Sequence, residues 1–253
     1  MSQISESEKW LVRPKPNPDA RLRLFCLPFA GGTAMVFRTW PDDLPLDIEL
    51  CAVQLPGRET RLQEPPFSRM TDLVPVLDRA LRPFLDRPFV LFGHSMGGLI
   101  SFELIRHWRR KGDALPLHLF VSGRRSPDSP CRFPDMHDLP RGELIKKIRD
   151  YGGTPEAVLE EEELMDLIIP IIRADFSILE TYKYYEEKPL DLPITVYAGT
   201  EDIRTTPDEL EAWRRHTTAS VAVRNFSGDH FFLQSVRDVV LQALSEDLSR
   251  IMP

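Results

Sequence analysis

The stretch Phe89–Gly98, which reads FVLFGHSMGG, determines the expected fold. Its first half is an apolar run typical of a buried strand, and residues 99–105 continue with the apolar spacing of a helix. Between them, Gly-His-Ser-Met-Gly matches G-x-S-x-G, a pattern in which a serine occupies a sharp turn between a strand and a helix. We therefore predict that this turn holds Ser95 above the sheet edge as a nucleophile.

The residues around this serine have physical roles of their own. Gly93 and Gly97 leave room for a turn whose central residue is strained, and Gly98 lets the helix pack close to the sheet. The backbone N–H of Met96 falls at the start of the helix, where it can donate to an oxyanion.

The length and composition indicate one folded α/β unit. The chain has 253 residues, of which 42% are hydrophobic and 28% charged, so it can bury a full core. Its formal net charge is −7, from 32 basic and 39 acidic residues. Because nonspecific nucleic-acid binding needs a basic surface, this balance argues against a nucleic-acid partner.

The sequence also argues against a membrane protein and against a metal enzyme. No apolar run approaches the roughly 20 residues that span a bilayer, and residues 1–9 lack a signal-peptide pattern. The three cysteines, Cys26, Cys51 and Cys131, form no C-x-x-C, and no cluster of His, Cys and carboxylates has metal-ligand spacing. We expect a cytoplasmic protein with no metal and no bound cofactor.

Apolar segments and helical stripes alternate along most of the chain, which predicts a mostly parallel sheet flanked by helices. Residues 1–20, with prolines at alternate positions, are expected to form an extended lead-in without a core of their own. Residues 124–190 break the alternation and read as loop and helices, most simply a lid over Ser95. The expected strands are 22–27, 48–53, 89–92, 117–123, 193–199 and 220–226, and the other expected helices are 70–85 and 233–251.

A serine hydroxyl needs a base, and the base needs an orienting group. In the α/β-hydrolase order an acid and then a histidine follow the serine, each after a late strand, and Asp202 and His230 occupy these places. Glu201 is a weaker candidate for the acid, and Asp229 precedes the histidine too closely to aim at it. The catalytic residues predicted are thus Ser95, Asp202 and His230.

Two loops follow the early strands. A Gly-rich loop after residue 27 is where this architecture places a second oxyanion donor, and we assign it to the backbone N–H of Ala30, with Phe29 as the nearest rival. Residues 54–67 mix charges and prolines, and their chemistry indicates only an ordered surface loop.

Several of these motifs together resemble the type II thioesterases, stand-alone α/β-hydrolases that accompany nonribosomal peptide and polyketide synthases. The similarity runs from about residue 20 to the end, and Pro-Gly-Arg-Glu is its most family-specific part. One departure is the acid segment 198–203, where many relatives have Gly-Gly and a second acid nearby. The segments that carry the resemblance are LPFAGG at 27–32, QLPGRE at 54–59, EPP at 64–66, GHSMGG at 93–98 and GDHFF at 228–232.

The resemblance implies a single α/β-hydrolase domain over residues 1–253 with a mobile helical lid. It also implies hydrolysis of acyl and aminoacyl thioesters on the phosphopantetheine arm of acyl or peptidyl carrier proteins, and it matches Ser95, Asp202 and His230 to the family's triad. We expect a monomer. Because such carriers are usually acidic, docking would need a basic patch, for which Arg124, Arg125 and Arg132 are candidates.

Other functions remain open from the sequence. The same triad would serve a carboxylesterase or lipase-like enzyme acting on small esters. A noncatalytic binding protein of this fold is disfavoured by the intact set of Ser, Asp and His. A chain-releasing cyclase would differ only in whether water or an internal nucleophile resolves the acyl-enzyme, and a free-standing chain favours water.

Overall fold

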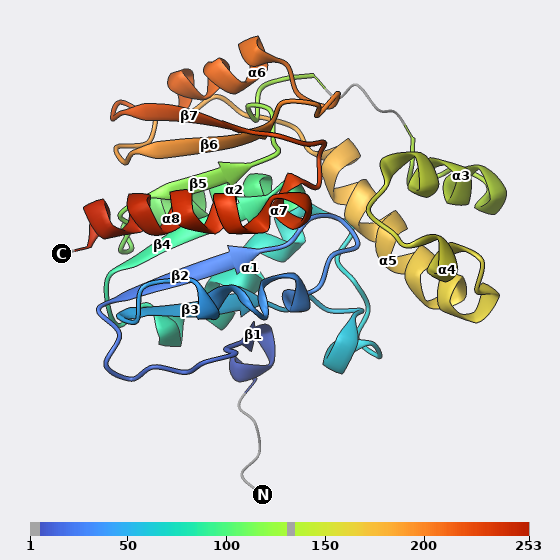
Figure 1. Ribbon diagram of the computed structural model, residues 1–253, viewed down its shortest axis with the longest axis horizontal. Helices are drawn as coiled ribbons and strands as arrows, with labels where there is room; N and C mark the ends of the chain where they lie inside the picture. The colour runs from blue at the N-terminus through green and yellow to red at the C-terminus, as the bar shows by residue number, and fades with distance from the viewer. Residues whose placement is uncertain (1–5, 131–134, 253) are drawn as a thin grey trace, which may run out of the picture.

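A computed structural model describes residues 6–130 and 135–252. Within these residues one sheet has seven strands in the order β1-β3-β2-β4-β5-β6-β7. β1 runs antiparallel to β3, and all other neighbours are parallel (Figure 1). The strands are β1 (Leu11–Val12), β2 (Leu22–Leu27), β3 (Ile48–Val53), β4 (Phe89–His94), β5 (Leu119–Ser122), β6 (Ile194–Gly199) and β7 (Val221–Phe226).

Helices cover both faces of this sheet. One face packs against α1 and α2, and the other packs against α8 (Figure 1). The strands between them are buried on both sides, which explains why their sequences are apolar runs and do not alternate. The helices are α1 (Met70–Leu81), α2 (Met96–Lys111), α3 (Arg141–Tyr151), α4 (Glu156–Leu159), α5 (Glu162–Thr181), α6 (Pro207–Glu211), α7 (Phe232–Ser235) and α8 (Arg237–Ile251).

These layers confirm the predicted α/β-hydrolase fold, with small changes at element ends. The stripe at 70–85 ends as an α-helix at Leu81, because Pro83 cannot supply a helical N–H. The expected closing helix is divided at Val236 into α7 and α8. The elbow helix ends as expected, since Gly112 takes the left-handed conformation with φ of 71°.

The lead-in differs from the extended chain expected for residues 1–20. Glu8–Trp10 forms a short 3-10 helix, and β1 follows it and pairs with β3. Trp10 is buried, and the guanidinium of Arg61 lies 4.0 Å from its ring centroid. Trp10 belongs to the apolar cluster between the sheet and helices α1 and α2, here called the main core, and so anchors this segment there.

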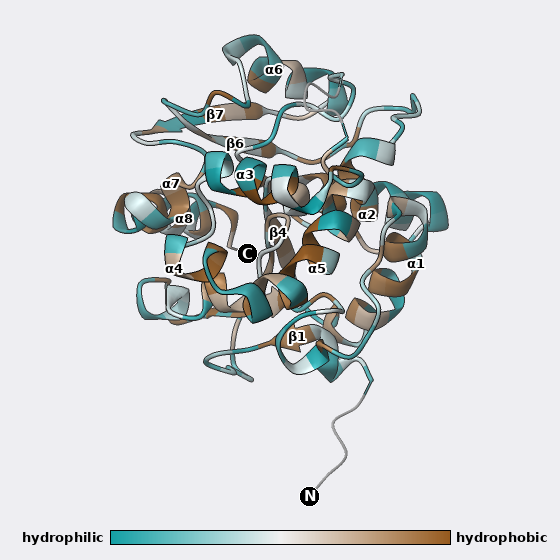
Figure 2. Ribbon diagram, turned by 90° about the vertical axis from the view of Figure 1, so that its right-hand side faces the viewer, coloured by the Kyte–Doolittle hydropathy of each residue, from teal (hydrophilic) through white to brown (hydrophobic). Residues whose placement is uncertain are grey.

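The helical insertion, α3 to α5, lies between β5 and β6 in the chain and beside the carboxyl ends of the strands (Figure 1). Figure 2 looks onto this end of the molecule, with α5 in front of β4. The insertion has an apolar cluster of its own, separate from the two clusters that flank the sheet. No helix in the described parts of the chain is long and apolar enough to span a bilayer.

Candidate active site

Ser95 occupies the turn between β4 and α2 in a backbone conformation that residues other than glycine rarely adopt, with φ of 52° and ψ of −110°. Its backbone N–H donates to the carbonyl of Ser122 on the next strand, at 2.7 Å. A Cβ on Gly93 would lie 2.3 Å from the carbonyl carbon of Gly97, and one on Gly97 would lie 2.1 Å from the carbonyl oxygen of Leu27. The close approach of backbones therefore requires both glycines, as the sequence indicated.

His230 and Asp202 meet at the carboxyl ends of β7 and β6. The Nδ1 of His230 lies 2.7 Å from Oδ2 of Asp202, and the Asp202 side chain is fully buried. Glu201 is exposed, and Oδ1 of Asp229 accepts from the backbone N–H of Phe231 at 2.8 Å. Of the three carboxylates considered from the sequence, only Asp202 contacts the histidine.

Arg204 connects the Asp202 loop to the helical insertion. Its backbone N–H donates to Oδ1 of Asp202 at 2.9 Å, which occupies the carboxylate oxygen that His230 leaves free. Its guanidinium stacks 4.2 Å from the ring centroid of Tyr151, at the end of α3, and donates to the Tyr151 carbonyl at 3.0 Å. Sequence reasoning did not identify Arg204 or Tyr151.

His94 supports the turn, as its position within the motif predicted. Its Nδ1 lies 2.9 Å from Oγ of Ser122, and burial, with a smaller effect of neighbouring His230, holds the pKa of His94 well below its usual value. Gly123 fills the adjacent space, since a Cβ there would lie 2.7 Å from Cε1 of His94 and 3.3 Å from Cε1 of His230. Its φ of 58° also disfavours any side chain, a requirement that the sequence pattern did not reveal.

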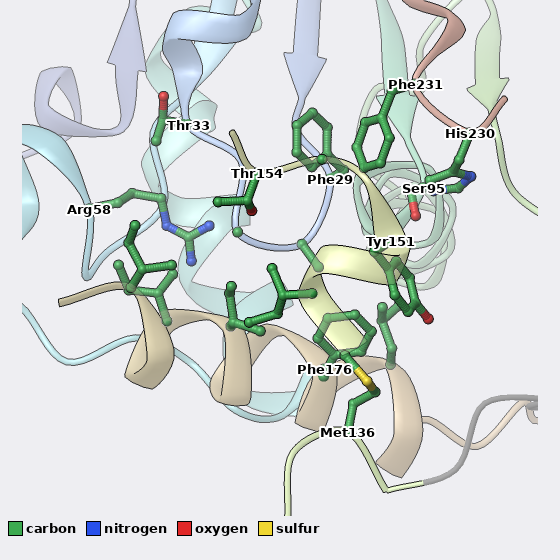
Figure 3. A pocket seen from close by; sticks show the side chains of 18 of the residues that line it. Phe29, Thr33, Arg58, Ser95, Met136, Tyr151, Thr154, Phe176, His230 and Phe231 are labelled. Carbon is green, nitrogen blue, oxygen red and sulfur yellow. The ribbon is translucent and has the colours of Figure 1, made fainter. Parts of the chain in front are cut away.

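Ser95 and His230 line the same cavity, of about 740 Å³, and lie toward the same side of it in Figure 3. Pockets of this size hold ligands of drug-like dimensions. Most of the remaining wall is apolar and comes from the helical insertion. Met136, just before α3, adds to this wall. The apolar side chains that the insertion contributes are Ile148, Val158, Leu164, Leu167, Ile168, Ile171, Ile172, Phe176 and Leu179.

Two backbone N–H groups remain available beside the serine. Met96 begins α2, and Ala30 lies in the turn after β2 and lines the cavity. Among the described residues, neither N–H donates a hydrogen bond. The turn itself is closed by a 2.9 Å bond from the Gly32 N–H to the Phe29 carbonyl, with Gly31 at φ of 77°.

The proposed basic patch is not supported where the structure describes it. Arg125 is only 7% exposed and lines the cavity, together with half-buried Arg124, and Arg132 lies outside the described residues. No group of three or more His, Cys, Asp or Glu side chains with metal-site geometry occurs in the described ranges.

The interpretation of residues 54–67 as a surface loop is wrong for its first half. Gln54 and Arg58 are buried, and Arg58 forms an ion pair with Asp175 of α5. A charge in a polar loop reads as solvent-exposed unless its partner is known, and this partner is 117 positions away. Two signals were present: the Pro-Gly-Arg-Glu motif itself, and a lone aspartate within the apolar stripe of α5.

The chain is similar to known thioesterases over nearly its whole length. A family model described as a thioesterase domain matches residues 22–248. The gramicidin S biosynthesis protein GrsT of Aneurinibacillus migulanus is 42% identical over 252 residues, covering 100% of this chain and 98% of its own. A medium-chain S-acyl fatty acid synthase thioesterase of Rattus norvegicus is 35% identical, covering 90% of this chain and 87% of its own.

A solved structure is similar over the same extent. The type II thioesterase BorB from the borrelidin biosynthetic cluster superimposes with a TM-score of 0.86 at 36% identity, covering 96% of this chain and 98% of that one. The resemblance inferred from the sequence motifs is thereby confirmed. The chain belongs to the thioesterase family.

Proposed function

We propose that this chain is an editing type II thioesterase, which hydrolyses acyl and aminoacyl thioesters on the phosphopantetheine arm of carrier proteins. The observation that carries the proposal is that Ser95 and His230, which is bound to Asp202, line one cavity whose remaining wall is mostly apolar. The likeness to GrsT and BorB, which are named for gramicidin S and borrelidin biosynthesis, supports a carrier-bound substrate.

In the first step, Ser95 Oγ attacks the thioester carbonyl while Nε2 of His230 takes the hydroxyl proton. Asp202 holds the imidazole through Nδ1 and stabilises its cation. The N–H groups of Met96 and Ala30 receive the oxyanion. When the tetrahedral intermediate collapses, the C–S bond breaks, and His230 returns the proton to the leaving pantetheine thiolate.

In the second step, water replaces the departed thiol. His230 takes a proton from the water while the water oxygen bonds to the acyl carbon. The N–H groups of Met96 and Ala30 donate to the second oxyanion. Collapse breaks the ester bond and returns the proton to Ser95. The products are a free acid and a carrier protein with a free thiol, ready to be loaded again.

The helical insertion supplies an apolar surface for the acyl group of the substrate. Its apolar wall stabilises a hydrocarbon chain by removing it from water, at about 0.8 kcal/mol per buried methylene. We propose that α3 to α5 act as a lid that admits the arm and then excludes water. A monomeric state, a cytoplasmic location and independence from any cofactor stay predictions.

The test is release of acetyl and aminoacyl groups from a phosphopantetheinyl carrier protein, with wild type, Ser95→Ala and Ser249→Ala compared side by side. Ser249 is exposed on α8, so its substitution controls for effects of a Ser→Ala change on folding and purification. A p-nitrophenyl ester assayed in parallel measures general esterase activity.

We expect fast carrier-dependent release from wild type and Ser249→Ala, and none above background from Ser95→Ala. Turnover of the p-nitrophenyl ester with no release from the carrier would overturn the editing role in favour of a general esterase. Full activity of Ser95→Ala on the carrier would overturn the proposed mechanism.

A further inference from the structure

Arg58 and Asp175 form a bidentate ion pair that is almost completely buried. Nη2 of Arg58 lies 2.8 Å from Oδ1 of Asp175, and Nη1 lies 2.9 Å from Oδ2. The two side chains are 3% and 1% exposed. Such a pair has a defined geometry, because two parallel hydrogen bonds fix both the distance and the angle between planar groups.

The same two side chains also bind the turn that carries Ala30. Oδ2 of Asp175 accepts from the backbone N–H of Gly31 at 2.7 Å, and Nη1 of Arg58 donates to the carbonyl of Gly32 at 3.0 Å. The ion pair therefore holds the turn at two consecutive residues, directly after the proposed oxyanion donor. Arg58 appears at the edge of the cavity in Figure 3, on the side away from His230.

The pair joins two parts of the fold. Arg58 follows β3. Gln54, the residue directly after β3, fixes the Arg58 segment by donating to the Arg58 carbonyl at 3.1 Å and accepting from the Ala34 N–H at 3.0 Å. Asp175 comes from α5. On that helix it lies between Ile172, which belongs to the cluster of the helical insertion, and Ile178, which belongs to the main core.

We propose that Arg58 and Asp175 are a positioning pair, which sets the oxyanion turn in place only when α5 is docked against it. The proposal rests on the proposed function, since it gives the Ala30 N–H its role. Neither side chain touches the reacting atoms. Their effect is to make the second oxyanion donor depend on the position of the helical insertion, so that the site is complete only while that insertion covers it.

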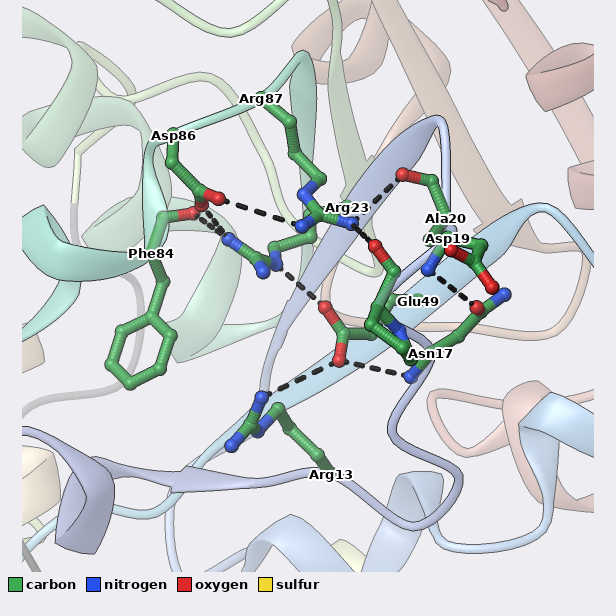
Figure 4. A network of polar contacts seen from close by, with 10 residues as sticks. Arg13, Asn17, Asp19, Ala20, Arg23, Glu49, Phe84, Asp86 and Arg87 are labelled. Atoms are coloured by element: carbon green, nitrogen blue, oxygen red, sulfur yellow. Dashed lines mark hydrogen bonds and ion pairs between the residues drawn. The ribbon is translucent and has the colours of Figure 1, made fainter.

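A purely structural role must be separated from this one, because removal of one partner leaves an unpaired buried charge and destabilises any protein. The chain offers a control at a second buried ion pair, that of Arg23 and Glu49, in which Arg23 also contacts Asp86 (Figure 4). Nε of Arg23 lies 2.7 Å from Oε2 of Glu49, with side chains 7% and 2% exposed. These residues are partners between β2 and β3 and do not line the cavity.

The experiment compares Asp175→Ala, Glu49→Ala and the double variant Arg58→Met/Asp175→Leu with wild type. Apolar replacement of both partners often restores stability, so the double variant separates folding from positioning. For each protein we would measure Tm, kcat and KM, and the inhibition constant of an acyl trifluoromethyl ketone. That ketone forms a tetrahedral adduct with the serine and reports on the oxyanion site directly.

We expect both single variants to lower Tm, but only Asp175→Ala to lower kcat, by roughly 100-fold with little change in KM. The double variant should recover Tm and keep the low kcat, and the inhibition constant should rise by a similar factor. Recovery of kcat in the double variant, or an unchanged inhibition constant beside a low kcat, would overturn the proposal.

A p-nitrophenyl ester serves as well as a thioester for these measurements, because both pass through an oxyanion. The positioning role can therefore be judged even if release from the carrier fails. Equal losses of kcat in Glu49→Ala and Asp175→Ala would reduce the pair to a structural one.

Discussion

His230 and Asp202 are joined by a 2.7 Å hydrogen bond between Nδ1 and Oδ2, although they lie 28 positions apart in the chain. The bond forms because β6 and β7 are parallel neighbours, so the loops that follow them meet at one edge of the sheet. It engages Nδ1 of His230, whose side chain lines the cavity, and so leaves Nε2 as the ring nitrogen that can serve as the base.

Substitution Asp202→Asn should keep the fold and lower kcat by about 1,000- to 10,000-fold, because an amide stabilises neither the correct tautomer nor the imidazolium. Steady-state kinetics with an acyl thioester would measure the loss. Glu201→Gln and Asp229→Asn are matched controls and should stay close to wild type, since neither carboxylate contacts His230 in the structure. A loss of similar size in Glu201→Gln would contradict the assignment of the acid.

Gly97→Ala should destabilise the protein by about 3 kcal/mol, because the new Cβ meets the Leu27 backbone and neither strand nor helix can give way. Gly142→Ala is the matched control: a Cβ there meets nothing within 4 Å, and the residue lies near the start of α3. The control should change stability by less than about 1 kcal/mol. Urea unfolding would measure both, and equal stability of the two variants would exclude this steric account.

Ile168→Phe should shift the chain-length preference toward short acyl groups. Ile168 lies on α5 and lines the cavity, so a larger side chain takes up volume that a long acyl chain would fill. We expect kcat/KM for an octanoyl thioester to fall roughly 10- to 100-fold relative to an acetyl thioester.

The acetyl substrate is the internal control for the serine and its partners in that comparison. Val239→Phe, at an exposed position on α8, controls for an added aromatic ring. If acetyl and octanoyl rates fell together in Ile168→Phe, the cavity wall would not determine chain length.

His118 should make the protein less stable in acid. It is buried, its Nε2 lies 2.8 Å from Oγ1 of Thr195, and burial lowers its pKa to about 4. Between the ordinary histidine pKa of roughly 6.5 and this value, the unfolded chain binds a proton that the folded chain does not. His118 therefore leaves the free energy of unfolding at its full value above pH 6.5 and lowers it by about 3 kcal/mol as the pH falls to 4.

Urea unfolding of wild type and His118→Gln at pH 7, 6, 5 and 4 would check this effect. The glutamine cannot take up a proton in this range, so stability of the variant should fall less steeply. His94 and His216, whose pKa values burial also lowers, are present in both proteins and contribute equally. Parallel stability curves for the two proteins would contradict the assignment to His118.

The sequence alone determined the features that depend on local chemistry. Two glycines around Ser95 are required by contacts between adjacent segments, and a G-x-S-x-G turn between an apolar strand and a helix has few other solutions. The order of acid and histidine after late strands placed Asp202 and His230, since parallel strands deliver their following loops to one edge. The buried strands were visible as apolar runs because helices cover both faces of the sheet.

Only the tertiary structure decided which charges are buried and what they contact. Arg58 and Asp175 are 117 positions apart, and no periodicity relates them. The sequence therefore indicated a surface loop at Arg58, although its side chain is buried beside the site. Arg125 lines the cavity and is not a surface charge, and Gly123 must lack a side chain because two histidines converge on it. Burial of a polar residue depends on a partner that folding brings from elsewhere, and local sequence does not contain that information.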